Sequence, residues 1–198
     1  MTDTAIQEII AAGQRLAALG LVHAHFGNIS CRLDEYRILI TATGVSKGSL
    51  TKQDILPIDY QGQVLEASAG RRPSSETPLH LALYANNPQI MAIIHTHPPY
   101  ATALFDTVEN PDWNIPEETG RFFGPMMQLP SLPAGSLELA QAAAAAAKDA
   151  NSLFLAGHGA VSWGESIEQA LCRMEILEHT AKVMLLQGLL KHAVSGHV

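Results

Sequence analysis

Cysteine is scarce in this chain, and its scarcity excludes one way of building a stable fold. Cys31 and Cys172 are the only two cysteines among 198 residues, too few for the disulfide framework of a small secreted protein. Both lie in amphipathic segments, so we expect reduced thiols. The fold must therefore depend on a packed core, for which the length and the 47% hydrophobic content are sufficient.

Further absences narrow the function. The chain has 12 Lys and Arg against 19 Asp and Glu, a net charge of −7, and no basic run, so nucleic acid is not expected as a partner. The longest apolar stretch, residues 142–147, has polar flanks and is too short to cross a membrane. The first residues carry no positive charge of the kind that opens a signal peptide. We therefore expect a cytoplasmic protein with no membrane partner.

Helical and strand-like periods alternate along the chain, which predicts a sheet with helices on both faces. Residues 106–133, rich in Pro, Gly and aromatics, are expected to be mostly loop with short strands. No linker or internal repeat is visible, so residues 1–198 are interpreted as a single domain. Helices are expected over residues 4–19, 76–85, 136–150 and 166–190, and strands over 36–41, 55–60, 63–65, 90–97 and 152–156, the second and third strands forming a hairpin.

Two histidines end the apolar run at 90–97. Side chains at i and i+2 of a strand share a face, so His95 and His97 are expected side by side where the strand leaves the core. A third histidine, His158, follows another short apolar run and has glycine on both sides. Three imidazoles at two strand ends can supply the protein ligands of an open metal site, whose fourth position is left for water or substrate. The remaining histidines are interpreted as structural or surface residues: His23, His25, His80, His179, His192 and His197.

Small polar residues at other element ends indicate an anion site. Ser74 and Ser75 precede an expected helix, where free backbone N–H groups attract phosphate, although their simplest role is to cap that helix. Glu76 in the first turn has two interpretations: a carboxylate that satisfies the helix terminus, or a metal ligand or base. The segments 27–30 and 43–46 are two further glycine-containing turns of the kind that offers donors to phosphate.

Together these motifs resemble the class II aldolase/adducin family, and within it the L-fuculose-phosphate aldolase type. The resemblance covers nearly the whole chain in family order: Gly27-Asn28-Ile29-Ser30, Thr43-Gly44, Ser74-Ser75-Glu76, His95-Thr96-His97 and Gly157-His158-Gly159. It implies a three-layer α/β/α sandwich with a mixed, largely antiparallel central sheet. It also implies a homotetramer with active sites at subunit interfaces.

The resemblance also implies a mechanism and the residues that carry it. His95, His97 and His158 would bind one Zn²⁺ per subunit, and Glu76 would be the acid/base and a metal ligand at rest. The expected reaction is cleavage of a phosphorylated ketose, such as L-fuculose 1-phosphate or a pentulose phosphate, to dihydroxyacetone phosphate and an aldehyde. Zinc, as a Lewis acid, would stabilise the enediolate. The substrate phosphate would be held by Asn28, Thr43, Gly44, Ser74 and Ser75.

One departure from the aldolase pattern keeps other reactions open. Family aldolases use tyrosines after the His-x-His motif as proton donors, but this chain has no tyrosine after Tyr100. Glu117, Glu118 or a histidine near the C-terminus are possible replacements. The alternatives, in order, are a methylthioribulose-1-phosphate dehydratase type, a sugar-phosphate 4-epimerase or decarboxylase with the same metal site, and an adducin-like interaction module without catalysis. Other divalent transition metals could replace zinc.

Overall fold

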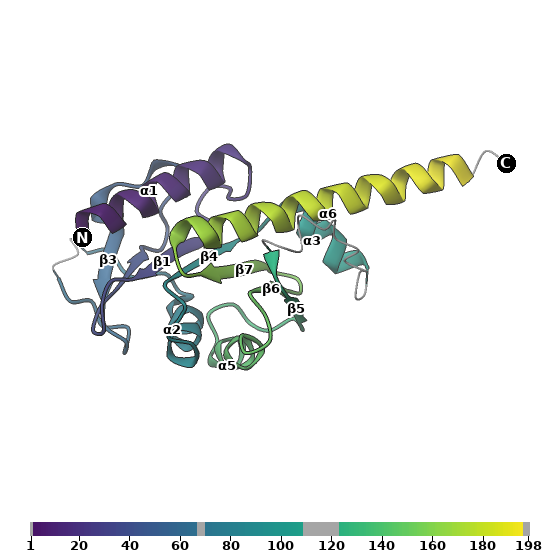
Figure 1. Ribbon diagram of the computed structural model, residues 1–198. Helices are drawn as coiled ribbons and strands as arrows, with labels where there is room; N and C mark the ends of the chain where they lie inside the picture. The colour runs from purple at the N-terminus through teal and green to yellow at the C-terminus, as the bar shows by residue number, and fades with distance from the viewer. Residues whose placement is uncertain (1, 67–69, 109–122, 196–198) are drawn as a thin grey trace.

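The computed structural model describes residues 2–66, 70–108 and 123–195, and they form a three-layer α/β/α arrangement (Figure 1). The central layer is one seven-stranded sheet in the order β3-β2-β1-β4-β7-β6-β5. Every neighbouring pair is antiparallel except β5 and β6, which run parallel. The strands are β1 (Asn28–Arg32), β2 (Ile38–Thr41), β3 (Ile55–Ile58), β4 (Ala92–Thr96), β5 (Met126–Leu129), β6 (Ser152–Leu155) and β7 (Gly159–Gly164).

Helices cover both faces of the sheet, as predicted. α1, α3 and α6 lie on one side of the sheet in Figure 1, and α2 and α5 lie on the other. Adjacent strand residues alternate between the two cores: Ile94 packs with the α1/α6 side and Ile93 with the α2/α5 side. The helices are α1 (Thr2–Ala18), α2 (Thr77–Asn86), α3 (Pro99–Thr107), α5 (Leu137–Ala146) and α6 (Ile167–Ser195), with short 3₁₀ turns η1 (Lys47–Ser49) and η2 (Lys52–Asp54). The expected fold class is confirmed.

Three local predictions were wrong. Residues 28–30 were interpreted as part of a turn, but they begin β1, a strand inside the sheet; only Gly27 has the positive φ of a turn, at 74°. The expected second strand of the hairpin, 63–65, is reduced to a single bridge between Val64 and Ile58. β7 was missed because its glycine-rich sequence does not show the alternation of a typical strand.

α3 was also missed, because two prolines, Pro98 and Pro99, directly follow the expected strand and the sequence suggested no helix after them. Pro99 instead occupies the first turn of α3, where its missing N–H removes no helical hydrogen bond. The free N–H groups of Tyr100 and Ala101 donate to the carboxylate of Glu178 on α6, at 3.0 and 2.9 Å. A distant side chain therefore stabilises the start of this helix, and no local pattern predicts that contact.

Among the described residues, no helix is both long and apolar enough to cross a membrane.

α1 packs closely against η1, and Gly13 makes this contact possible. A Cβ at Gly13 would lie 2.3 Å from the carbonyl oxygen of Lys47 and 2.9 Å from Leu50 Cδ1. Gly13→Ala should therefore destabilise the fold by roughly 1–3 kcal/mol through overpacking, despite the better helix propensity of alanine. Thermal and urea unfolding would measure this change.

Gly188 in α6 provides the matched control, because a Cβ there meets no atom within 4 Å. Gly188→Ala should leave stability unchanged or raise it by up to about 1 kcal/mol. Equal effects of the two substitutions would contradict the proposed packing of α1 on η1.

Candidate metal centre and substrate pocket

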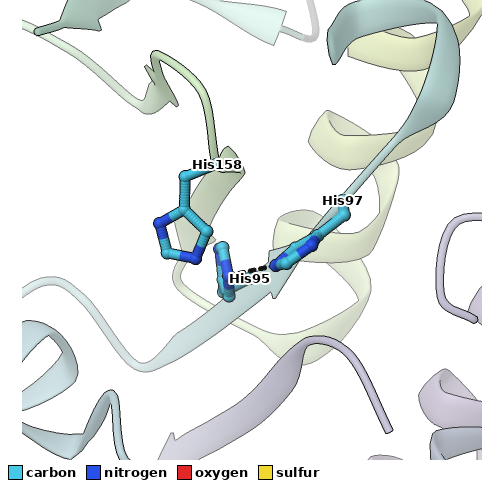
Figure 2. A group of neighbouring side chains, drawn as sticks. All are labelled: His95, His97 and His158. Atoms are coloured by element: carbon cyan, nitrogen blue, oxygen red, sulfur yellow. Dashed lines mark hydrogen bonds between the residues drawn. The ribbon is translucent and has the colours of Figure 1, made fainter. Parts of the chain in front are cut away.

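Two strand ends bring three histidines together (Figure 2). His95 lies near the end of β4 and His97 follows that strand, while His158 lies in the turn between β6 and β7. Because β4 and β7 are paired antiparallel, this turn folds back over the end of β4. Gly159 permits the approach, since a Cβ there would lie 2.4 Å from the carbonyl oxygen of Thr96.

The hydrogen bonding of His95 prepares its ring for a metal. His95 Nδ1 lies 2.9 Å from the carbonyl oxygen of Ala160. A carbonyl only accepts, so Nδ1 must carry the proton and Nε2 of the neutral ring presents a lone pair to the cluster. His95 Nε2 and His97 Nε2 are 3.1 Å apart. Nitrogen ligands of tetrahedral zinc lie ~3.3 Å apart when each Zn–N distance is about 2.0–2.1 Å.

Glu76 completes the cluster from the opposite side. Its Oε2 lies 2.9 Å from His95 Nε2, and its Oε1 lies 3.4 Å from His158 Nε2. Oε1 is buried and makes no hydrogen bond with the described residues. A carboxylate oxygen and an imidazole lone pair repel at these distances unless a cation lies between them. The donor set, three imidazoles and a carboxylate, therefore fits a divalent ion such as zinc.

Burial and charge act in opposite directions on the ionisable groups of this cluster. Burial raises the pKa of Glu76, but attraction to the His95 and His158 rings in their protonated forms, with hydrogen bonds from protonated His95 and from Asn28, brings that pKa below its usual value. Burial lowers the pKa of His97 to about 4 and also lowers the pKa of His158. Near neutral pH, Glu76 is therefore ionised while His97 and His158 are neutral, which are the forms that bind metal.

Two of the segments expected to bind phosphate, residues 43–46 and Ser74-Ser75, lie side by side because the chain after β2 pairs with residues 72–74. Thr43 N donates to the Arg72 carbonyl at 3.0 Å, and Ser74 N donates to the Thr41 carbonyl at 3.2 Å. This pairing brings Thr43 and Gly44 next to the serines. One pocket contains every site residue predicted from the sequence: Asn28, Thr43, Gly44, Ser74, Ser75, Glu76, His95, His97 and His158.

The interpretation of Ser74 or Ser75 as the cap of α2 was wrong. α2 begins at Thr77 with Glu76 in the cap position, and no side chain makes a capping hydrogen bond there. Ser74 Oγ instead accepts from the N–H of Glu76 at 3.3 Å, directly before the helix begins. Ser75 is exposed, so its side chain is available to a ligand.

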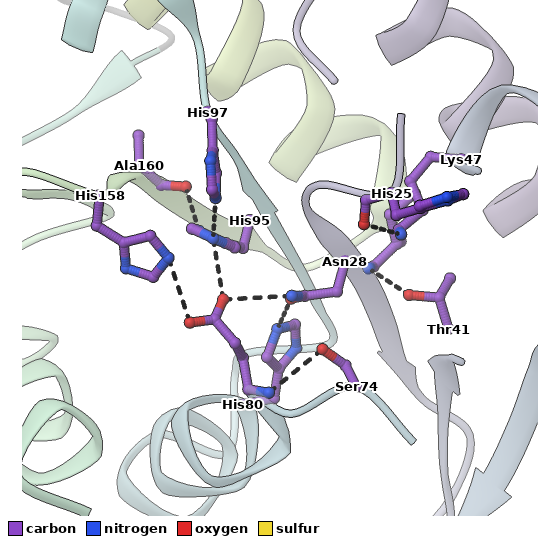
Figure 3. Close-up of polar contacts among 12 residues, drawn as sticks. His25, Asn28, Thr41, Lys47, Ser74, His80, His95, His97, His158 and Ala160 are labelled. Atoms are coloured by element: carbon purple, nitrogen blue, oxygen red, sulfur yellow. Dashed lines mark hydrogen bonds and ion pairs between the residues drawn. The ribbon is translucent and has the colours of Figure 1, made fainter. Parts of the chain in front are cut away.

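Lys47 was not predicted as a site residue, although it lines the pocket. Its side chain is almost fully buried, and Nζ donates to the carbonyl oxygens of His25 and Val45 at 3.0 and 2.7 Å. Figure 3 shows the contact with His25. Burial lowers the pKa of Lys47 to about 8, and Asp54 opposes that shift. A buried cation beside two phosphate-type turns makes the pocket more attractive to an anion. The sequence feature that could have indicated Lys47 as a pocket residue is its position next to Gly48, shortly after Thr43-Gly44.

An aromatic ring also borders the pocket. Phe26 stacks on His97 with ring centroids 5.0 Å apart and an interplanar angle of 16°, yet Phe26 is 54% exposed. The contact fixes the plane of one candidate ligand and leaves an apolar surface at the pocket rim. Glu117 and Glu118, named above as possible proton donors, lie outside the described residues.

Comparison with known proteins agrees with this geometry. Residues 7–185 match the family of the Class II Aldolase and Adducin N-terminal domain. The chain is 35% identical to a 3-oxo-tetronate 4-phosphate decarboxylase of Haemophilus influenzae, over 95% of this chain and 91% of that protein. It is 35% identical to an L-fuculose phosphate aldolase of Methanococcus maripaludis, over 83% of this chain and 87% of that protein.

A third relative and a solved structure extend the comparison. A methylthioribulose-1-phosphate dehydratase of Methylococcus capsulatus is 32% identical over 89% of this chain and 91% of its own. The crystal structure of a sugar-phosphate aldolase from Thermotoga maritima superposes with a TM-score of 0.85, at 28% identity, over 96% of this chain and 97% of that one. These similarities confirm the expected lyase of the class II aldolase type, and the chain belongs to the class II aldolase and adducin family.

Proposed function

We propose that this protein is a zinc-dependent lyase that breaks the bond between the carbons α and β to the keto group of a phosphorylated substrate. His95, His97 and His158 would hold the metal. The phosphate would be held by Thr43, Gly44, Ser74 and Ser75, and Lys47 would add positive charge. Asn28 lines the same pocket and contacts Glu76. The observation that carries the proposal is the contact of Glu76 with His95 and His158, because a carboxylate that lies against the three imidazoles could carry a proton to a substrate bound there.

Zinc in this cluster would act as a Lewis acid that stabilises negative charge on the substrate's keto oxygen. When the bond between the carbons α and β to the keto group breaks, its electron pair stays on the α carbon of the phosphate-bearing fragment and produces an enediolate. Glu76 in its acid form would then donate a proton to the carbanionic carbon, giving dihydroxyacetone phosphate. In the condensing direction the Glu76 carboxylate would remove the same proton. The phosphate contacts would fix the distance between Glu76 and this carbon.

The leaving fragment decides between two reactions that share this enediolate. An aldol cleavage must remove a proton from the hydroxyl of the departing aldehyde, and L-fuculose 1-phosphate or a pentulose phosphate would be the substrate. A decarboxylation releases CO₂ and needs no such base. No tyrosine lines the pocket among the described residues, which favours the decarboxylase as the second candidate. The decarboxylase of H. influenzae in the comparison gives it further support.

We also propose that the protein assembles into a homotetramer with active sites near the interfaces. α6 extends beyond the body of the protein (Figure 1), and three large apolar side chains near its end are exposed: Leu186, Leu189 and Leu190, at 49, 68 and 66%. Such a surface is typical of an interface. Light scattering coupled to gel filtration should give four chain masses, and a single chain mass would contradict the proposal.

The proposed metal site predicts one zinc per chain after purification in zinc-containing buffer. His95→Ala and His158→Ala should each remove most of the bound metal, because an open site with two imidazoles left binds weakly. His179→Ala is the control, since this histidine is exposed on α6 and far from the cluster in sequence. Metal content would be measured by mass spectrometry on protein whose folding is checked by circular dichroism. Full occupancy in His95→Ala would contradict the site.

The proposed reaction predicts distinct products from four test compounds: L-fuculose 1-phosphate, ribulose 1-phosphate, 3-oxo-tetronate 4-phosphate and methylthioribulose 1-phosphate. Mass analysis should detect dihydroxyacetone phosphate with an aldehyde or with CO₂. Glu76→Gln should lower kcat by about 10²- to 10⁴-fold, the usual contribution of a general acid or base, while zinc remains bound. Loss of water without chain cleavage would instead identify a dehydratase, and full activity of Glu76→Gln would exclude the proposed role.

A further inference from the structure

A chain of buried polar side chains leads away from Glu76, between α2 and β1. Glu76, His80 and Tyr84 are spaced by four residues and follow one side of the helix. Asn28 and Ser30 are spaced by two residues and point from the same face of β1. The two sets interlock: Asn28 lies between Glu76 and His80, and Ser30 lies between His80 and Tyr84.

Four short contacts connect these five side chains. Asn28 Nδ2 lies 3.3 Å from Glu76 Oε2, and Asn28 Oδ1 lies 2.5 Å from His80 Nε2. Ser30 Oγ lies 2.6 Å from His80 Nδ1 and 2.8 Å from the Tyr84 hydroxyl. Figure 3 shows the Asn28 amide between the His80 ring and the histidine cluster.

The charge on Glu76 determines the direction of every bond in this chain. An ionised carboxylate only accepts, so Asn28 must present its NH₂ group to Glu76 and its Oδ1 to His80. His80 must then donate from Nε2, which leaves a lone pair on Nδ1. Ser30 must donate to that lone pair, and its oxygen in turn accepts from Tyr84. Each proton position follows from the one before it.

Burial makes the alternatives costly. The side chains of Ser30, His80 and Tyr84 are between 0 and 2% exposed, so water cannot replace a missing partner. Burial also lowers the pKa of His80 to about 3, which keeps the ring neutral with one proton to place. An unpaired buried donor or acceptor costs more than an ordinary hydrogen bond contributes. The far end is fixed as well, because Arg32 donates to the Tyr84 carbonyl at 2.9 Å and lies over its ring.

We propose that His80 is a positioning residue: through its Nε2–H it holds the Asn28 amide in the one orientation that donates to Glu76, and so fixes the carboxylate beside the metal cluster. If His80 carried its proton on Nδ1, the Asn28 amide would turn over and present its oxygen to the carboxylate, which would repel it. The inference rests on the proposed function in so far as Glu76 carries the proton. The interpretation of His80 as merely structural is thereby replaced by a role in orienting the base.

The tautomer of His80 can be read directly, without any substrate. Two-dimensional ¹H–¹⁵N spectra of the histidine rings in the zinc-loaded protein distinguish a protonated ring nitrogen from one with a lone pair, and the His80→Gln spectrum assigns the signal. The expected result is a neutral His80 ring with its proton on Nε2. A proton on Nδ1, or on both nitrogens, would overturn the proposal. The tautomer can be measured even if none of the test compounds is a substrate. A failure of this proposal can therefore be distinguished from a failure of the proposed function.

Kinetics with whichever of the four test compounds the protein cleaves then tests the consequence. His80→Leu removes both ring nitrogens and should lower kcat by about 10²-fold, the cost of a misplaced catalytic group, with KM and zinc content close to those of the wild type. His80→Gln keeps an N–H donor for Asn28 and should recover part of that loss. Equal kcat values for the two variants, or an effect on KM alone, would contradict the positioning role.

Leu83→Ala is the matched control for packing, because Leu83 is fully buried on α2 but is not one of the hydrogen-bonded side chains between Glu76 and Tyr84. It should lower the melting temperature while leaving kcat near the wild-type value; a loss of kcat as large as that of His80→Leu would indicate a general effect of loosening α2. Should His80→Leu fail to fold, Ser30→Ala replaces it. That substitution removes the donor to Nδ1 and should lower kcat, and an unchanged kcat would contradict the proposal.

Discussion

The repulsion between a carboxylate and imidazole lone pairs in a buried space is the constraint on which the site depends. Glu76 and His95 face each other at 2.9 Å, and in a neutral His95 ring Nε2 carries no proton to place between them, because Nδ1 donates to a carbonyl. A cation would remove this repulsion, and a divalent metal bound by the three histidines would do so for the whole cluster. The same negative charge on Glu76 sets the direction of the hydrogen bonds that continue through Asn28 to His80.

The sheet supplies the rigid frame that this arrangement needs. β1, β4 and β7 are neighbours in the centre of the sheet, and each contributes to the site at or beside one of its ends. Asn28 is opposite His95 in the pairing of β1 with β4, so the hydrogen-bond partner of Glu76 and a metal ligand are held in register by backbone hydrogen bonds. Positions fixed by strand pairing vary less than positions on loops, which is an advantage for a site that must hold several groups within a fraction of an ångström.

Much of this could be predicted from the sequence, and the failures have physical causes. The spacing of His95 and His97, the glycines around His158 and the small residues before Glu76 are local signals, and the structure brings all of them to one pocket. Lys47 was missed as a pocket residue because its position depends on burial and on a partner distant along the chain, the carbonyl of His25. The start of α3 was missed for the same reason, since Glu178 on α6 satisfies it. Asn28 was interpreted as a turn residue because it directly follows Gly27, whose presence is typical of a turn, although Asn28 is the first residue of a buried strand.

The most direct test of the account is anomalous X-ray diffraction at the zinc absorption edge from crystals grown with zinc. The account predicts one strong peak per chain among the Nε2 atoms of His95, His97 and His158, within coordination distance of all three. A fully folded, zinc-loaded crystal with no anomalous density among these three rings would contradict it.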